Sequence, residues 1–300
     1  MTTVRAGLIQ MSLKMDAARA PVEIREAMVA AHVPFIEEAA RRGVQVLCMQ
    51  EIFNHPYFCP TEDPRWFAGA EAVPDGPTIV LLRELARRHA MVIVAPVYEL
   101  DPGGVRYNTA AVIDADGRFL GKYRKVHVPW RPQGAAEQYY FGHGNLGFPV
   151  FNTAYCRLGV YICYDRHFPE GWRALALNDA QYIVNPSATP AGTSRHLWHL
   201  EQPAAAVAND VYIGAVNRVG MEAPWNIGNF YGSSYFVNPR GEIIAQAADD
   251  RDELLVADLD LALIEETRAK WQFPEHRRPD AYGELTRPRQ ASTKDKFAGP

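Results

Sequence analysis

The chain has 300 residues, 48% of them hydrophobic and 22% charged, which is typical of a globular protein with a substantial core. The formal net charge is -4, and the arginines that adjoin one another occur as isolated pairs, which argues against nucleic acid as a partner. No segment reaches the about 20 apolar residues of a membrane span, and the N-terminus lacks the apolar run of a signal peptide. We therefore expect a cytoplasmic protein that binds neither nucleic acid nor membrane.

The first half of the chain alternates strand and helix patterns. A strand pattern over 4–10 precedes a helical pattern over 21–43, in which five apolar residues recur at helical spacing: Ile24, Met28, Ala31, Phe35 and Ala39. The nearly continuous apolar run over 44–51 is typical of a strand covered on both faces. The remaining predictions for this half are a helix over 78–89, a strand over 91–99, and a hairpin of strands 107–114 and 118–125 around Ala115-Asp116-Gly117.

The second half repeats the alternation. The predicted elements are a strand over 158–163, a helix over 169–179, a strand over 180–188, a helix over 196–210 despite Pro203, a strand over 211–217, a hairpin of strands 233–239 and 242–247, a strand over 253–260 and a last helix. Such alternation predicts an α/β fold whose sheets are covered by helices. No Pro/Gly-rich linker divides the chain, so we expect one domain over 1–286 and an extended tail over 287–300.

The cysteines and histidines do not suggest a disulfide scaffold or a metal site. The four cysteines are irregularly spaced, and no Cys-x-x-Cys pair is present. His196 and His199 are three residues apart, but no third ligand lies nearby in the sequence. We therefore expect reduced thiols and no metal.

Three polar residues stand at the ends of predicted strands. Glu51, Lys125 and Cys163 each follow an apolar run, and ligands of α/β sheets bind at the carboxyl ends of strands. If the three strands are parallel neighbours, these side chains face one pocket.

A carboxylate, an ammonium and a thiol together can carry out acyl transfer without a cofactor. The carboxylate can take the proton of the thiol, and the ammonium can favour the thiolate and then the oxyanion of a tetrahedral intermediate. Simpler interpretations remain open, because Cys163 could be a small buried hydrophobic residue and Glu51 and Lys125 a surface pair.

Several sequence segments resemble a known family. "MQEIF", "KYRKVHVP" and "YICYDRHFPE", in this order and at these separations, resemble the three catalytic segments of the nitrilase (carbon-nitrogen hydrolase) superfamily. "NPSAT", "NRVG", "FYGSSYFVNPRG" and "LLVADLDL" resemble its β-ureidopropionase (N-carbamoyl-β-alanine amidohydrolase) branch. The resemblance implies an α-β-β-α sandwich of two stacked mixed sheets flanked by helices, without a cofactor. By analogy with the family it also implies a homodimer or larger homo-oligomer.

The resemblance also implies roles for individual residues. Glu51 would be the general base, Lys125 the oxyanion-stabilising cation and Cys163 the nucleophile that forms a thioester. Glu137 matches a second glutamate of the family, although the preceding "WRPQGAA" departs from the family pattern. Lys122 competes with Lys125 for its role, but it lies three residues earlier in the strand and should point to the other face.

The residues just after Cys163 bear on the substrate. The guanidinium of Arg166 can bind a substrate carboxylate through two hydrogen bonds, or it can pair with Asp165 or Glu170. D-amino-acid carbamoylases of the superfamily often have two consecutive arginines here, whereas this chain has His167 second. We therefore expect N-carbamoyl-β-alanine as the substrate, with N-carbamoyl-α-amino acids, including D-amino acids, or another aliphatic amide as alternatives.

Four residues have open or supporting roles. The backbone N–H of Tyr164 would help to bind the oxyanion, and His127 would contact the substrate or pack beneath Pro129. The roles of His143 and His167 stay open. A protein of another class, a non-catalytic ligand sensor on the same fold, would be expected to have lost a member of the catalytic set, and none is missing.

Overall fold

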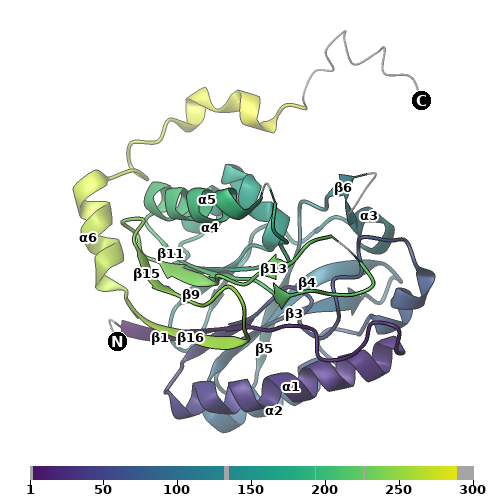
Figure 1. Ribbon diagram of the computed structural model, residues 1–300. Helices are drawn as coiled ribbons and strands as arrows, with labels where there is room; N and C mark the ends of the chain where they lie inside the picture. Colours follow the sequence, from purple (N-terminus) through teal and green to yellow (C-terminus); the bar gives the residue numbers. More distant parts are fainter. Residues whose placement is uncertain (1–2, 132–134, 193, 226, 289–300) are drawn as a thin grey trace, which may run out of the picture.

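Two six-stranded sheets lie face to face in the centre of the molecule, and helices cover the outer face of each (Figure 1). Helices α1 (Pro21–Arg41) and α2 (Pro77–His89) cover one sheet, and α4 (Pro169–Leu177) and α5 (Ser194–Asn209) cover the other. The computed structural model describes residues 3–131, 135–192, 194–225 and 227–288. This arrangement is the expected α-β-β-α sandwich. Within the described ranges, no helix has the length and apolarity that a bilayer span demands.

The first sheet has the strand order β16-β1-β2-β3-β4-β5. Its strands are β1 (Thr3–Gln10), β2 (Val46–Met49), β3 (Val92–Leu100), β4 (Arg106–Ile113), β5 (Phe119–Arg124) and β16 (Glu253–Asp260). The strands β1, β2 and β3 are parallel, whereas β4 pairs antiparallel with both β3 and β5. Because of these two reversals, β5 runs in the same direction as β2, and both strands end at the same edge of the sheet.

The second sheet has the strand order β15-β14-β11-β10-β9-β8. Its strands are β8 (Val150–Asn152), β9 (Arg157–Val160), β10 (Tyr182–Pro186), β11 (Tyr212–Val216), β14 (Tyr235–Val237) and β15 (Ile243–Gln246). The central strands β9, β10 and β11 are parallel, and α4 and α5 connect them. Each sheet thus has a parallel centre and antiparallel edges.

Short elements complete the chain. They are the paired strands β6 (Trp130–Arg131) and β7 (Ala135–Ala136), the paired strands β12 (Val219–Gly220) and β13 (Phe230–Tyr231), α3 (Glu137–Tyr140), α6 (Ala262–Trp271), and the 3-10 turns η1 (Pro64–Gly69), η2 (Cys163–His167), η3 (Pro279–Ala281) and η4 (Gly283–Thr286).

The alternation of side chains along β4 separates two apolar cores. Ala110 and Val112 point toward the second sheet, and Ala111 and Ile113 belong to the core beneath α1 and α2. Side chains on a strand alternate between the faces of the sheet, so neighbouring polar residues of β4 must also point to opposite sides.

Most elements expected from the sequence are present, and both expected hairpins form, as β4–β5 and β14–β15. Helix α5 passes through Pro203 without ending. In α1 the expected buried positions were partly wrong, because His32 and Ile36 are buried in place of Ala31 and Phe35. The buried residues Met28, His32 and Ile36 are each four positions apart. Because His32 is polar, a pattern of apolar residues does not include it.

The strands before Glu51, Lys125 and Cys163 are not parallel neighbours, so the condition under which sequence alone placed these side chains in one pocket is not met. Two strands, β3 and β4, separate β2 from β5, and β9 belongs to the other sheet. Local patterns identify strands but do not specify which distant strands pair, so the number of sheets followed from the family resemblance and not from the strand patterns.

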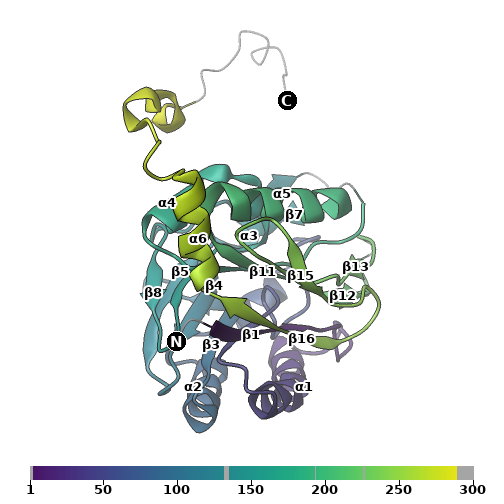
Figure 2. The same cartoon turned by 90° about the vertical axis from the view of Figure 1, so that its left-hand side faces the viewer.

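The chain leaves the compact body after α6. Figure 2 shows residues 272–288 as an arm that reaches away from both sheets, and most of its residues are exposed. The expected boundary between residues 286 and 287 stays a prediction, and residues 289–300 of the expected tail lie outside the described residues.

Candidate active site

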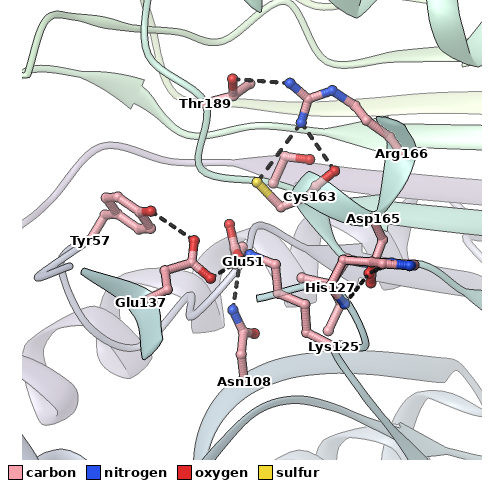
Figure 3. A network of polar contacts seen from close by, with 12 residues as sticks. Glu51, Tyr57, Asn108, Lys125, His127, Glu137, Cys163, Asp165, Arg166 and Thr189 are labelled. Carbon is pink, nitrogen blue, oxygen red and sulfur yellow. Dashed lines mark hydrogen bonds and ion pairs between the residues drawn. The ribbon is translucent and has the colours of Figure 1, made fainter. Parts of the chain in front are cut away.

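A lysine and two glutamates form a buried cluster at the edge where β2 and β5 end. The Nζ of Lys125 lies 2.9 Å from Oε1 of Glu51 and 2.7 Å from Oε2 of Glu137 (Figure 3). All three side chains are buried. When ionised, the cluster has two negative charges and one positive charge, so its formal net charge is negative.

The two carboxylate oxygens of Glu51 differ in their surroundings. Oε1 accepts hydrogen bonds from Lys125 and, at 2.7 Å, from Nδ2 of Asn108 on β4. Oε2 is buried and has no hydrogen-bond partner among the described residues. A buried acceptor is normally paired, so an unpaired carboxylate oxygen needs an explanation. Here it is an oxygen that is free to accept a proton.

The surroundings of Lys125 and Glu137 shift their titration. Burial alone would lower the pKa of Lys125, but the charges of Glu137 and Glu51 outweigh it and hold that pKa well above its usual value. Burial raises the pKa of Glu137, although Lys125 acts in the opposite direction. The hydroxyl of Tyr57 donates to Oε1 of Glu137 at 2.8 Å. Lys125 is therefore a permanently charged ammonium at neutral pH.

Cys163 is the first residue of the 3-10 turn η2. Tyr161 and Ile162 separate it from Val160, the last residue of β9. The φ of Cys163 is 48°, in the left-handed region that residues other than glycine rarely adopt. Figure 3 shows its sulfur directed toward Arg166 on one side and the carboxylates on the other. Strained backbone of this kind is common where a reactive side chain must be displayed at the end of a strand.

The thiol of Cys163 is protonated at neutral pH. Burial and the charge of Glu51 raise its pKa to about 12, although Lys125 and Arg166 lower it. The ammonium therefore does not produce a resting thiolate as the sequence suggested, because two carboxylates already balance its charge. A nucleophilic Cys163 requires a base at the moment of reaction.

Asp165 fixes the turn that carries Cys163. Its carboxylate accepts hydrogen bonds from the Tyr123 hydroxyl at 2.7 Å and from the backbone N–H of Ile162 at 3.1 Å. It also accepts one from the backbone N–H of His127 at 2.9 Å, and Nδ1 of His127 lies 2.7 Å away. The turn is thus tied to the segment that follows Lys125.

His127 is held on both sides of its ring. Besides its contact with Asp165, the ring stacks on Phe168 with 3.7 Å between centroids. A direct contact of His127 with the substrate stays a prediction. Through Asp165 and Phe168, His127 joins the segment after Lys125 to the turn that carries Cys163.

The guanidinium of Arg166 is buried beside the nucleophile. Its Nη1 donates to the backbone oxygen of Cys163 at 3.0 Å and lies 3.9 Å from the sulfur, while Nη2 lies 3.4 Å from Oγ1 of Thr189. Its Nε faces Oε2 of Glu201 at 3.6 Å. The charged partner of Arg166 is therefore Glu201 on α5, which the sequence did not suggest.

The other residues near the turn are placed as follows. Nδ1 of His167 lies 2.8 Å from Oε1 of Glu201, so His167 and Arg166 share one carboxylate. The ring of Tyr164 contacts the ring of His167, with centroids 5.1 Å apart. His143 lies in a loop, with Nδ1 3.2 Å from the backbone oxygen of Val126.

Lys122 is not part of the cluster around Glu51. Its Nζ lies 2.5 Å from Oε1 of Glu99, which also pairs with Arg124, on the face of the sheet that Thr109 shares. This is the face expected for a residue three positions before Lys125.

Sequence reasoning missed Asn108, Thr189, Glu201 and Arg218, all of which contact the predicted site residues or their backbone. Asn108 gives no distinct signal, because Arg106 and Thr109 of the same strand are polar as well.

No group of three or more His, Cys, Asp or Glu side chains in the described part of the chain is arranged to hold a metal ion. The ring of His199 stacks on Tyr235, with 5.2 Å between centroids. The four cysteines are free and buried.

Comparisons with known proteins agree with this geometry. The family model described as carbon-nitrogen hydrolase matches residues 5–269. The chain is 37% identical over 297 residues to a beta-ureidopropionase of Arabidopsis thaliana, a match that covers 94% of this chain and 72% of the relative. It is 39% identical over 258 residues to an N-carbamoylputrescine amidase of Solanum lycopersicum, which covers 82% of this chain and 85% of the relative.

A solved structure also matches nearly the whole chain. The crystal structure of a carbon-nitrogen hydrolase from Helicobacter pylori G27 has a TM-score of 0.87 and 30% sequence identity, covering 95% of this chain and 99% of that chain. These matches confirm the resemblance seen in the sequence, the sandwich fold and an enzyme that hydrolyses carbon–nitrogen bonds of amides. The chain belongs to the carbon-nitrogen hydrolase family.

Proposed function

We propose that the protein hydrolyses N-carbamoyl-β-alanine to β-alanine, ammonia and carbon dioxide through a thioester on Cys163. The observation that carries this proposal is the buried guanidinium of Arg166, whose Nη1 lies 3.9 Å from the sulfur of Cys163. A guanidinium so close to the nucleophile can bind the carboxylate of a short ureido acid while its carbamoyl carbon meets the sulfur. The relative named beta-ureidopropionase supports the same choice.

The first half of the reaction uses the unpaired oxygen of Glu51. As the sulfur of Cys163 attacks the carbamoyl carbon, Oε2 of Glu51 accepts the thiol proton. The developing oxyanion is stabilised by Lys125 and by the backbone N–H of Tyr164. Glu51 then gives the proton to the departing NH₂ group, which leaves as ammonia, and a carbamoyl thioester remains on the sulfur.

The second half repeats the proton transfer with water. Glu51 accepts a proton from the water as its oxygen attacks the thioester carbon, and the sulfur leaves and recovers that proton. The released N-carboxy-β-alanine loses carbon dioxide to give β-alanine. Throughout both halves Glu137 balances the charge of Lys125 and holds its ammonium in place through the 2.7 Å ion pair.

The orientation of Arg166 favours acids over neutral substrates. Glu201 lies against the Nε edge of the guanidinium, and the contacts of Nη1 with sulfur and of Nη2 with Thr189 are long, at 3.9 and 3.4 Å. One N–H of Nη1 is held by the backbone oxygen of Cys163 at 3.0 Å, whereas its other N–H and Nη2 make only these long contacts and can exchange them for a carboxylate. N-carbamoyl-α-amino acids, including the D-forms, present the same carboxylate one methylene closer and are the alternative substrates.

The test measures ammonia release from N-carbamoyl-β-alanine, N-carbamoyl-α-amino acids, N-carbamoylputrescine and a neutral N-alkylurea, with the wild type and with Arg166→Ala. We expect N-carbamoyl-β-alanine to have the highest kcat/KM, and the substitution to lower it roughly 30- to several-thousand-fold. The neutral urea should be a poor substrate of both proteins. Arg166→Lys should restore part of the loss, because it returns the charge without the two-pronged geometry.

Equal losses on the acid and the neutral urea would contradict carboxylate recognition by Arg166. A preference for N-carbamoylputrescine would move the assignment to a cationic substrate. Failure to release ammonia from any of these compounds would leave the ureido-compound assignment without support.

We also propose that the protein forms a homodimer or larger homo-oligomer. Leu177 at the end of α4 and Leu200 on α5 are exposed on the outer helical layer, and Trp271 at the end of α6 and Leu285 in the arm are exposed as well. A second copy packed on these side chains would bury their apolar surface. Light scattering during gel filtration should give at least twice the mass of one chain, and Leu200→Glu should reduce it.

A further inference from the structure

Arg218 and Glu222 form a buried ion pair beside the segment that carries Glu51. Nη1 of Arg218 donates to Oε1 of Glu222 at 2.6 Å, and both side chains are almost completely excluded from solvent. They lie just after β11, in the second sheet, whereas Glu51 follows β2 in the first. The pair therefore links the two sheets at the edge where the candidate site lies.

The other Nη of Arg218 binds the backbone turn after β2. Nη2 donates to the carbonyl oxygens of Glu51 at 2.8 Å, Ile52 at 2.6 Å and His55 at 2.6 Å. Ile52 has a φ of 47°, a left-handed conformation that is strongly disfavoured for a β-branched residue. This backbone conformation persists only when surrounding residues stabilise it, and the contacts of Arg218 with the three carbonyl oxygens do so.

Glu222 extends the link to the second glutamate. Its Oε2 accepts a hydrogen bond from the backbone N–H of Tyr57 at 2.6 Å. The hydroxyl of Tyr57 in turn donates to Glu137, one of the two carboxylates that bind Lys125. One ion pair thus holds both ends of the segment from Glu51 to Tyr57.

We propose that Arg218 and Glu222 are positioning residues that set the place of Glu51 and, through Tyr57, of Glu137. They do not contact the reacting atoms, and the inference rests on the role of Glu51 as general base in the proposed function. A guanidinium reaches the three carbonyl oxygens and the carboxylate from two nitrogens held in one plane, with the two N–H groups of Nη2 shared among the three carbonyls. A lysine would provide the charge without the geometry.

The experiment compares Arg218→Lys with the double variant Arg218→Gln/Glu222→Gln, which removes both charges together and leaves no unpaired buried ion. With N-carbamoyl-β-alanine, we expect kcat to fall about 10- to 100-fold in each, because a base displaced by about 1 Å loses most of its effect. KM should change little, since Arg166 is untouched. The rate at which iodoacetamide alkylates Cys163 should rise as kcat falls, because a displaced Glu51 raises the pKa of the thiol less and more of it is thiolate.

Two controls separate positioning from general stability. Lys122→Met removes a cation that contacts Glu99 and the backbone of Val73 but not the turn after β2, and its kcat should stay near wild type. All rates are referred to the folded fraction, measured by thermal melting at the assay temperature.

The following results would overturn the inference. A folded double variant whose kcat and Cys163 alkylation rate match the wild type would show that the pair does not position the base. An equal loss in Lys122→Met would show that any damaged ion pair has the same effect. If Glu51→Gln itself keeps full turnover, the proposed base is wrong and this inference falls with it. If Glu51→Gln is inactive while the Arg218 and Glu222 variants are active, this inference alone fails.

Discussion

Two buried clusters of charge lie on opposite faces of the first sheet, and they are built from neighbouring residues of the same strands. Asn108 of β4 points to the cluster around Glu51, and the adjacent Thr109 points to a cluster around Glu99. At β5, Lys125 belongs to the first cluster and Lys122 to the second. The alternation of the strand thus divides similar residue types between two sites.

The cluster around Glu99 is fully paired. Its Oε1 accepts from Lys122 at 2.5 Å and from Nη2 of Arg124 at 2.6 Å, and its Oε2 accepts from Thr109 at 2.6 Å and from Nε of Arg124 at 2.9 Å. Burial alone would raise the pKa of Glu99, but these hydrogen bonds outweigh it and lower that pKa. Two cations surround one carboxylate, and no oxygen is left to accept a proton.

The cluster around Glu51 has the opposite balance. Two carboxylates share one ammonium, and Oε2 of Glu51 has no partner in the described structure. A carboxylate with every lone pair used stabilises a fold, whereas one with a free, buried oxygen next to a thiol can move a proton. Glu51 and Glu99 are both fully buried, so pairing is what distinguishes the proposed base from the structural carboxylate.

The largest effect should come from exchanging each central glutamate for glutamine. Glu51→Gln keeps the shape and removes the base, so kcat should fall by about 10²- to 10⁴-fold with little change in melting temperature. Glu99→Gln should keep kcat within a few-fold but lower the free energy of unfolding by about 3 kcal/mol, because buried cations lose their partner. Steady-state kinetics and thermal melting measure both. A Glu51→Gln enzyme with a tenth of wild-type turnover would place the base elsewhere.

The two lysines give the next largest contrast. Lys125→Met removes the cation at the oxyanion and leaves two carboxylates together, so we expect kcat to fall by about 10²- to 10³-fold. Lys122→Met leaves Glu99 paired with Arg124 and should keep kcat near wild type. Assays at saturating substrate measure this difference. Similar losses in both variants would remove the functional distinction between the two faces of the sheet.

The sequence places three polar residues at the ends of strands. Glu51, Lys125 and Cys163 each follow an apolar run, which made them candidates, and their roles, which the family resemblance implied, stay predictions. The arrangement of the strands was not accessible, since pairing between distant segments depends on tertiary packing that a local pattern does not contain.

The supporting residues escaped prediction for a different reason. Asn108 resembles any polar residue in a strand, and Arg218 after β11 resembles a surface arginine, although both are buried. The left-handed backbone at Ile52 and Cys163 runs against local propensity. Such conformations persist because the surrounding structure imposes them, so only the folded chain reveals them.

A third prediction concerns the pH at which Cys163 ionises. The charge of Glu51 contributes to the raised pKa of that thiol, about 12 in the wild type. In Glu51→Gln this contribution is lost while Lys125 and Arg166 remain, so the thiolate should form at lower pH than in the wild type. Thiolate absorbance measured against pH, with Cys163→Ala subtracted, should reveal this. Glu99→Gln should titrate as the wild type does, and an unshifted Glu51→Gln curve would contradict the electrostatic contact.

The smallest effects are expected from separate substitutions of the two adjacent polar residues of β4. Asn108→Leu removes one of the two hydrogen bonds to Oε1 of Glu51, leaving the carboxylate held by Lys125 alone, with its free oxygen no longer fixed toward the sulfur. Hydrogen bonds to charged groups contribute about 1.5 to 3 kcal/mol, so kcat should fall at least about 10-fold. Thr109→Val removes the equivalent bond to Glu99 and should lower stability while kcat stays within about twofold, because Arg124 still binds both oxygens. Steady-state kinetics and thermal melting of the two variants measure their kcat and their stability. If Thr109→Val lowers kcat as much as Asn108→Leu does, the two faces of the sheet act on the site together, and the separation of a structural from a catalytic cluster is wrong.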